Sequence, residues 1–508
     1  MLAVLVGLLS LGIYARTLAT FVLPGDSGEF QVLVHQLGTA HTTGYATYLI
    51  LGNLFTRLLP VGDVAWRVNL FSAFMGAVTV GLVYVAGRLL SGSRSAGVFG
   101  AFALAAGFTF WSQAIIAEVY TTGAAFLAAV LMLTLMWYQT GKRWPILAAG
   151  LLGGVGLGAH GSLAPFGAAV AIFLLLNWRR WREWLMPGAA GTAIGLALYA
   201  GGMFWVDFNN APANIFRAAY SPARSQWGLT AADVANPVAR VWFLISAGQW
   251  RSAMFTNPLL DTQVRLGEYW ANLPRDILLP TLALATFGLV RLIQRDKRLA
   301  AFLSVGILLQ LIVYLNYNVG DRYVFFIPTY ILWVLLAAVG MADLIRIIAS
   351  QPWGGKPVQA VATVAIAAVC LLPLLWPQWD VIRKGEVAFT RVDDFLVRGD
   401  TKAVGKVAQL TTAALPADAI VFADWNWIWP YYYTAHIDQG KLGTQFIETY
   451  PRSDRRGIAL STLEFVRENI QQRPIYLADR YREFVDAGYT LHPVQMGATR
   501  FWQLESAP

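Results

Sequence analysis

The heptapeptide Pro24-Gly25-Asp26-Ser27-Gly28-Glu29-Phe30 marks the point where a long apolar segment gives way to a polar loop. The preceding segment has about twenty mostly apolar residues, the length needed to cross roughly 30 Å of hydrocarbon. Asp26 is therefore predicted to emerge at the far membrane surface. If the loop is already helical, the spacing of Asp26 and Glu29 places both carboxylates on one face. The alternative for Asp26 alone is a helix cap.

Composition indicates a polytopic membrane protein. Of the 508 residues, 57% are hydrophobic and 13% are charged, whereas soluble domains have about 25% charged residues. The net charge of +9 is explained by basic cytoplasmic loops, so we expect the lipid bilayer and no nucleic acid as a partner. Cys370 is the single cysteine and is interpreted as a packing residue. The N-terminal apolar run lacks a small-residue cleavage site, which favours a retained span.

Apolar runs predict about eleven transmembrane helices. They lie at 2–23, 67–90, 96–112, 119–138, 145–160, 162–177, 185–206, 277–293, 299–316, 323–347 and 357–376. Lys and Arg residues are concentrated in alternate loops, which predicts a cytoplasmic N-terminus in a cell membrane (inner or plasma membrane). The runs at 96–112 and 145–160 are short enough to be tilted or broken.

Two long loops are predicted on the outward side, within a membrane domain at 1–376. The first, 24–66, has apolar residues at helical spacing, which predicts two short amphipathic helices. We favour an interfacial position for them over burial. The second, 207–276, combines tryptophans with arginines, a composition that suits a lipid phosphate but also ordinary interfacial anchoring.

Composition changes after Pro377, and 377–508 is predicted to be a small soluble α/β domain. Strand-like runs occur at 419–423 and 474–478, and helix-like runs at 401–410 and 462–470. An odd number of spans places this domain outside the cytoplasm. The predicted fold is therefore a polytopic α-helical membrane protein with a small C-terminal extracytoplasmic α/β domain.

The predicted topology brings polar residues from separate outward loops to one membrane face, where they can share one site. Simpler readings stay open: an interfacial turn for Gln113 and Glu118, a structural histidine at 160, and an ion pair of Asp321 with Arg322. A divalent cation (Mg²⁺ or Mn²⁺) on Asp26, Glu29 and His41 or His160 is a weak expectation. The candidate residues are Asp26, Glu29, His41, Tyr45, Gln113, Glu118, Tyr120, His160, Asp321 and Arg322.

Several motifs resemble those of a protein-O-mannosyltransferase-like family in the GT-C superfamily of membrane glycosyltransferases. They are Gly25-Asp26-Ser27-Gly28-Glu29-Phe30, the stretch from Leu37 to Tyr45, Trp66 to Ala73, Trp111-Ser112-Gln113, Glu118-Val119-Tyr120, the glycine-rich turn ending in His160, and Gly320-Asp321-Arg322-Tyr323. The chain departs from the family at Thr42, Thr43 and Ala46, where prolines are usual.

The resemblance implies a GT-C fold and inverting transfer of a sugar, most simply a mannose-like hexose. The donor would be a polyprenyl-phosphate-linked sugar and the acceptor an extracytoplasmic protein or glycan. Asp26 matches the general base of the family, and Glu29 is the second candidate catalytic residue. Glu29 and the other candidates would contact donor, acceptor or metal. A lipid-linked substrate transporter or flippase, or a membrane scaffold with an outward binding domain, are the alternatives.

Overall fold

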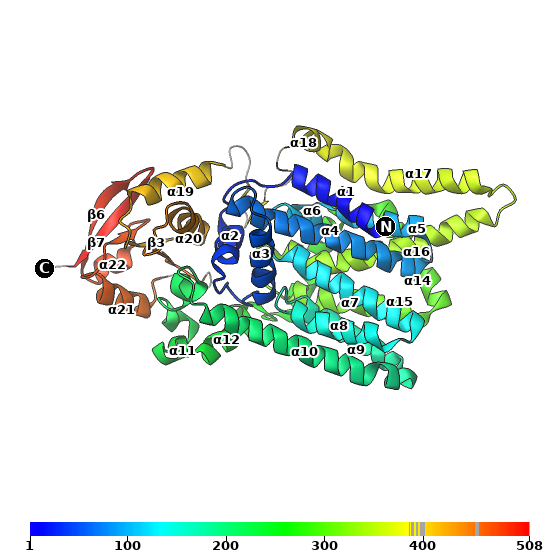
Figure 1. The fold of residues 1–508 in the computed structure, drawn as a ribbon, viewed down its shortest axis with the longest axis horizontal. Helices are drawn as coiled ribbons and strands as arrows, with labels where there is room; N and C mark the ends of the chain where they lie inside the picture. The colour runs from blue at the N-terminus through cyan, green and yellow to red at the C-terminus, as the bar shows by residue number, and fades with distance from the viewer. Residues whose placement is uncertain (386, 388–390, 393–394, 397–401, 453–456, 507–508) are drawn as a thin grey trace. The chain divides into compact units, whose positions relative to one another are not determined.

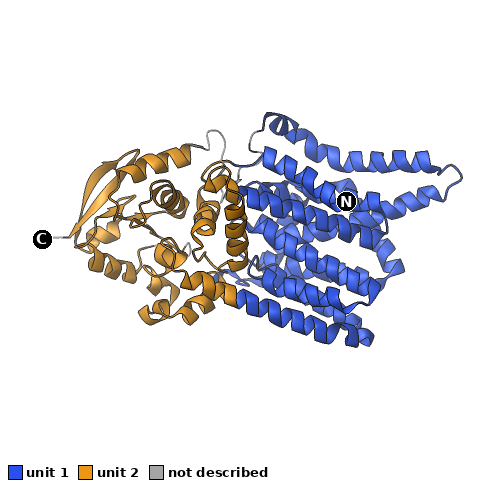
Figure 2. Ribbon diagram, viewed as in Figure 1, with its two compact units in different colours: residues 1–19, 69–200, 252–389 blue, residues 20–68, 201–251, 390–508 orange. Residues whose placement is uncertain are grey.

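The chain divides into two compact units in the computed structural model, which describes residues 1–385, 387, 391–392, 395–396, 402–452 and 457–506 (Figure 2). Unit 1 comprises Met1–Ala19, Asn69–Ala200 and Ser252–Phe389, and unit 2 comprises Thr20–Val68, Gly201–Arg251 and Thr390–Pro508. Each unit is therefore assembled from three separate stretches of sequence.

Unit 1 is helical (Figure 1). Its helices are α1 (Leu2–Arg16), α5 (Arg94–Ala105), α6 (Phe108–Ala114), α7 (Tyr120–Thr140), α8 (Arg143–Gly156), α9 (Leu163–Leu176), α13 (Pro258–Asn272), α14 (Leu279–Arg295), α15 (Lys297–Leu315), α16 (Ile327–Ala349), α17 (Lys356–Leu375) and α18 (Trp379–Lys384), with most of α4 (Val64–Ser91) and α10 (Trp181–Phe208).

Six helices of the described residues are long and apolar enough to cross a membrane, or up to eight if each bent pair is one span. The bent pairs are α5 with α6, at 70°, and the segment Pro258–Arg275 with α14, at 110°. Such a set of apolar helices fits a multi-pass membrane protein. The predicted count of about eleven spans is not confirmed, partly because α1 and α9 are shorter apolar helices.

The first predicted span, 2–23, is wrong in its extent because α1 ends at Arg16. The Arg16 guanidinium donates to the carbonyl oxygens of Ile382 and Arg383 at 3.2 and 2.9 Å. The chain then continues without a helix to Gly25. A charged side chain anchored to backbone carbonyls thus ends the apolar helix earlier than hydropathy indicates.

The run 96–112 is broken between α5 and α6, one of the alternatives expected for it, and a buried carboxylate contacts the break. Asp276 accepts hydrogen bonds from the Thr109 backbone N–H at 2.6 Å and from its hydroxyl at 2.7 Å. These bonds satisfy a backbone donor in the first turn of α6 that has no partner within the helix.

Unit 2 contains a mixed sheet with helices around it. The helices are α2 (Gly25–Gln36), α3 (Ala46–Leu58), α11 (Ala231–Ala235), α12 (Pro237–Ile245), α19 (Lys402–Ala414), α20 (Trp425–Tyr432), α21 (Leu460–Asn469) and α22 (Arg482–Asp486). The strands are β1 (Arg391–Val392), β2 (Phe395–Leu396), β3 (Ile420–Ala423), β4 (Gln445–Glu448), β5 (Ile475–Leu477), β6 (Tyr489–Met496) and β7 (Thr499–Ser506). The sequence predicts a domain boundary at 376. In the structure, the C-terminal strands belong to the same compact unit as α2 and α3.

The larger sheet has the order β4-β3-β5-β7-β6. Strand β3 is parallel to β4 and β5, and β7 is antiparallel to β5 and β6. One face packs a core that includes Ile420, Phe422, Ile475, Leu477 and Phe484. The carboxyl ends of β3 and β4 lie together because Ala423 pairs with Glu448.

Helices α2 and α3 correspond to the two short helices predicted in the first loop. Residues Ser27 to Val34 of α2 are all buried, which favours the burial alternative for this helix. Gly28 permits close packing on α20: a Cβ there would lie 2.3 Å from the Leu23 carbonyl oxygen and 3.1 Å from the Trp429 Cβ. By contrast, Leu54 and Leu58 of α3 are exposed.

Candidate functional site

Asp26, Glu29 and His41 form a cluster within unit 2. Both carboxylates lie in the first two turns of α2, and His41 lies in the loop before α3. Glu29 accepts from the His41 backbone N–H at 2.9 Å and contacts the imidazole Nδ1 at 2.5 Å. The other ring nitrogen, Nε2, is 3.8 Å from Asp26 Oδ2. The predicted shared face is therefore present, with an imidazole between the two carboxylates.

The two carboxylates differ in environment. The Glu29 side chain is 0% exposed and the Asp26 side chain is 27% exposed. Burial raises the pKa of Glu29, and the adjacent His41 opposes that rise. An ionised Glu29 can only accept, so the proton of its bond to His41 belongs on Nδ1, which leaves Nε2 facing Asp26. Asp26 can meet a substrate, whereas Glu29 orients the imidazole.

Asp26 is not the cap of α2, since Pro24 occupies the cap position. Its Oδ1 atom accepts a hydrogen bond of 2.7 Å from the indole N–H of Trp425. Trp425 begins α20, and Asp424 caps that helix by accepting from the Asn426 backbone N–H at 3.0 Å. Trp425 is not among the residues predicted from sequence, although it lies in a tryptophan-rich run directly after strand β3.

Aromatic rings surround His41. Its ring centroid is 5.8 Å from that of Phe30, 5.1 Å from Tyr45 and 6.0 Å from Trp425. These contacts restrict the rotation of the imidazole, in addition to its bond with Glu29. Tyr45, a predicted substrate contact, thus lies beside the cluster.

Further carboxyl groups gather at the carboxyl ends of the parallel strands. Asp424 directly follows β3, and Glu448 is the last residue of β4. Burial raises the pKa of Glu448 well above its ordinary value, and the negative charges of Asp424, Asp26 and Glu29 raise it further. Glu448 therefore keeps its proton where an ordinary glutamate is ionised. The sequence analysis did not single out either residue.

Tyr220 fixes the backbone directly after His41. The Thr42 backbone N–H donates to the Tyr220 hydroxyl at 3.3 Å, and that hydroxyl donates to Gln249 Oε1 at 2.6 Å. The tyrosine is fully buried. This connection stabilises the loop that holds the imidazole in place.

A second group of predicted residues lies in unit 1. The Tyr120 hydroxyl donates to Asp321 Oδ2 at 3.0 Å, and the Tyr120 ring is 5.0 Å from the His160 ring. The Ser162 backbone N–H donates to His160 Nδ1 at 3.1 Å. Because Nδ1 accepts this bond, the imidazole proton belongs on Nε2. Residues from three separate loops thus meet in this group.

The remaining predicted residues also belong to unit 1. Arg322 has its Nη2 atom 3.6 Å from Glu268 and its Nη1 atom 3.5 Å from the Tyr317 carbonyl oxygen. Gln113 and Glu118 are buried next to the connection between α6 and α7. The Glu118 backbone N–H donates to the Ser72 hydroxyl at 3.1 Å.

Asp26, Glu29 and His41 offer donor atoms that all lie within 4.8 Å of one another. However, Glu29 Oε1 already accepts from the His41 backbone N–H, and Glu29 Oε2 is already paired with His41 Nδ1. Mg²⁺ and Mn²⁺ prefer a shell of oxygen ligands. The cluster as arranged therefore does not fit such a cation.

Part of the chain is similar to known proteins. Residues 26–185 match the profile described as "Protein O-mannosyl-transferase TMEM260 N-terminal domain". A mouse protein named Protein O-mannosyl-transferase TMEM260 is 35% identical over 137 residues, which cover 26% of this chain and 20% of the mouse protein. The match thus spans about a fifth of that relative. The predicted resemblance to a protein-O-mannosyltransferase-like family is confirmed.

The fold is also similar to that of solved structures of other proteins. ArnT from Cupriavidus metallidurans, solved bound to undecaprenyl phosphate, has a TM-score of 0.59 at 13% identity and covers 100% of this chain and 98% of its own. The Archaeoglobus fulgidus oligosaccharyltransferase AglB, solved with an inhibitory peptide and a dolichol-phosphate, has a TM-score of 0.52 at 11% identity, covering 94% of this chain and 69% of its own. These likenesses concern the fold.

The region similar to the O-mannosyltransferase family begins at Asp26 itself. It contains most of the candidate residues, from Asp26 through His160, whereas Asp321, Arg322 and Trp425 lie beyond it. The matched region, residues 26–185, therefore includes the Asp26, Glu29 and His41 cluster.

Proposed function

We propose that this chain is a membrane glycosyltransferase. It moves a sugar, a mannose-like hexose, from a polyprenyl-phosphate carrier to a hydroxyl group of a protein or glycan acceptor, with inversion at the anomeric carbon. One observation carries the proposal: the partly exposed Asp26 carboxylate is held by Trp425 and faces an imidazole fixed by buried Glu29. The family match that starts at Asp26 supports the same reaction.

The reaction needs a base at the acceptor hydroxyl. Asp26 takes the hydroxyl proton as the oxygen attacks the anomeric carbon, and the bond from that carbon to the carrier phosphate oxygen breaks. The carrier phosphate leaves with the bonding electron pair. Trp425 holds Asp26 Oδ1, and Oδ2 lies on the side of the carboxylate that faces His41 Nε2, at 3.8 Å. Glu29 and His41 keep a polar, preorganised environment beside that oxygen.

The likeness to known proteins supports the substrate classes. ArnT has been solved with undecaprenyl phosphate, and AglB with dolichol-phosphate and a peptide. A polyprenyl-phosphate donor and a peptide acceptor are therefore the first substrates to test. A lipid-linked donor reaches a membrane site from the bilayer, and the alternation of basic loops orients that site to the outside of a cell membrane, with the N-terminus in the cytoplasm.

The test incubates the purified chain with a panel of polyprenyl-phosphate sugars and an acceptor peptide. Release of carrier phosphate together with glycosylated peptide is expected, and it should be absent with Asp26→Asn. Movement of the intact donor between bilayer leaflets without release of carrier phosphate would instead indicate a flippase. Absence of transfer with every donor and acceptor pair would contradict the proposal.

A further inference from the structure

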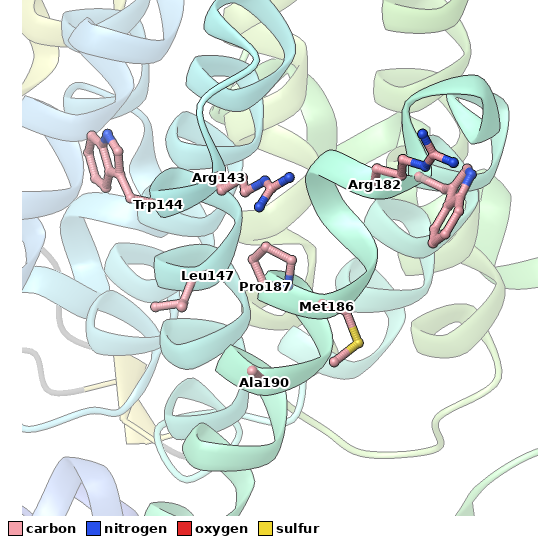
Figure 3. A pocket seen from close by; sticks show the side chains of 8 residues that line it. Arg143, Trp144, Leu147, Arg182, Met186, Pro187 and Ala190 are labelled. Carbon is pink, nitrogen blue, oxygen red and sulfur yellow. The ribbon is translucent and has the colours of Figure 1, made fainter.

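A cavity of about 730 Å³ lies between helices α8 and α10 of unit 1. The two helices run in the same direction and pack closely through glycines, since a Cβ at Gly191 would lie 2.0 Å from the Leu147 carbonyl oxygen. Arg143 opens α8, and Arg182 is in the first turn of α10. Figure 3 shows both guanidinium groups toward one end of this cavity, with Leu147, Met186 and Ala190 further along the helices.

The arginine end of the cavity carries uncompensated positive charge. The nearest acid in sequence, Glu183, is occupied by Arg180, whose Nη2 and Nε atoms donate to it at 2.6 and 2.9 Å. Within the described residues, Arg143 and Arg182 have no carboxylate partner, and the Arg182 guanidinium lies 5.5 Å from the Trp181 ring centroid. The cavity therefore suits an anion at this end.

The other end is apolar and open. Leu147 is 40% exposed and Met186 is 75% exposed, and Trp144 at the arginine end is 54% exposed. Met186 belongs to the segment Trp178–Phe208, which is one of the candidate membrane spans. Tryptophan and arginine at the end of a span are typical of headgroup depth, and apolar residues one or two turns further in are typical of acyl-chain depth.

We propose that this cavity binds an anionic phospholipid. The phosphate lies between Arg143 and Arg182, which donate charge-assisted hydrogen bonds to its oxygens, and an acyl chain lies along Leu147, Met186 and Ala190. The site is separate from the Asp26 cluster and does not depend on the proposed transfer reaction. Its apolar lining and its tryptophans favour a lipid over a free phosphate ion, which has no apolar part.

The test measures lipid binding to the full chain in mixed micelles by native mass spectrometry, with phosphatidylglycerol and phosphatidylcholine as probes. Arginines near a membrane surface contribute about 1 kcal/mol each, or roughly fivefold in affinity. The double variant Arg143→Gln/Arg182→Gln should thus bind phosphatidylglycerol about 25-fold more weakly. The matched control Arg88→Gln/Arg94→Gln removes the same charge from exposed positions elsewhere in unit 1 and should bind as the unaltered chain does.

A second variant covers the case in which the double variant unfolds. Leu147→Glu introduces a carboxylate at an exposed position and should also weaken phosphatidylglycerol binding while the melting temperature is unchanged. Equal binding of both lipids, an equal loss in the control variant, or displacement of phosphatidylglycerol by millimolar inorganic phosphate would overturn the proposal.

Discussion

The indole N–H of Trp425 donates a 2.7 Å hydrogen bond to Asp26 Oδ1, joining two residues that are 399 positions apart in sequence. The candidate base is thus oriented by a residue of the C-terminal segment, whose Trp429 also packs against Gly28 of α2. The C-terminal segment therefore forms part of the candidate catalytic cluster.

Trp425→Phe should lower kcat and leave the KM for the lipid donor unchanged. The phenyl ring keeps most of the packing but removes the donor, and a hydrogen bond to a charged group is worth about 1.5–3 kcal/mol, or roughly 10- to 150-fold in rate. Steady-state kinetics measure this split. Trp427→Phe is the control. The Trp427 ring stacks on the Tyr431 ring, with the two ring centroids 5.5 Å apart. Equal losses in both variants would indicate a general structural effect.

Gly28→Ala should destabilise unit 2. The added Cβ would lie 2.3 Å from the Leu23 carbonyl oxygen, and such overpacking costs about 1–3 kcal/mol. Chemical denaturation measures the loss. Gly405→Ala, whose Cβ would meet only Val22 at an ordinary 3.7 Å, is the matched control. A stable Gly28→Ala protein would show that α2 and α20 can separate.

Glu448→Gln should flatten the pH dependence of stability. The pKa of Glu448 is raised in the folded chain, chiefly by burial, so the folded state binds more protons than the unfolded state above pH about 4.3. The free energy of unfolding therefore falls as pH rises from that value through the folded pKa. Glutamine mimics the protonated acid and removes this contribution. Denaturation curves at pH values from 4 upward test it, and an unchanged slope would mean that Glu448 is ionised.

Arg322→Ala should raise the KM for the lipid donor more than the KM for the acceptor, if its guanidinium binds the carrier phosphate. Arg322 is held only at 3.5–3.6 Å by Tyr317 and Glu268, so it is free to exchange these partners for a phosphate. Arg94→Ala, at an exposed position, serves as the control. Equal effects on both KM values would argue against phosphate binding.

Removal of divalent cations should leave the transfer rate within about twofold, because the Glu29–His41 pair occupies the donor atoms a cation would use. Transfer is measured before and after chelation by EDTA. A complete loss that Mg²⁺ or Mn²⁺ restores would show that the cluster rearranges to bind metal.

Much of the site followed from local sequence. The spacing of Asp26 and Glu29 placed both carboxylates on one helix face, and both face His41. Trp425 and Glu448 were not predicted to lie near Asp26, because their proximity depends on how the distant helix α20, which follows β3, packs on α2. The burial of α2 was also missed, since polar residues such as Glu29 and Gln31 are hidden by partners that the sequence does not reveal.

The fold was predictable where apolar periodicity alone decides it. Helices such as α7 and α16 match the predicted runs at 119–138 and 323–347 within a few residues. The run 2–23 ended early because Arg16 binds two carbonyl oxygens from a segment more than 360 residues away. Hydropathy is averaged over a window of residues and carries no information on such specific contacts.

The role of Asp26 is tested most directly by the single-turnover rate of sugar transfer in Asp26→Asn, measured on protein whose melting curve matches that of the unaltered chain. General base catalysis contributes about 10²- to 10⁴-fold, so the rate should fall by at least the lower of these factors while the lipid donor still binds. A rate equal to that of the unaltered chain would contradict the assignment of Asp26 as the base.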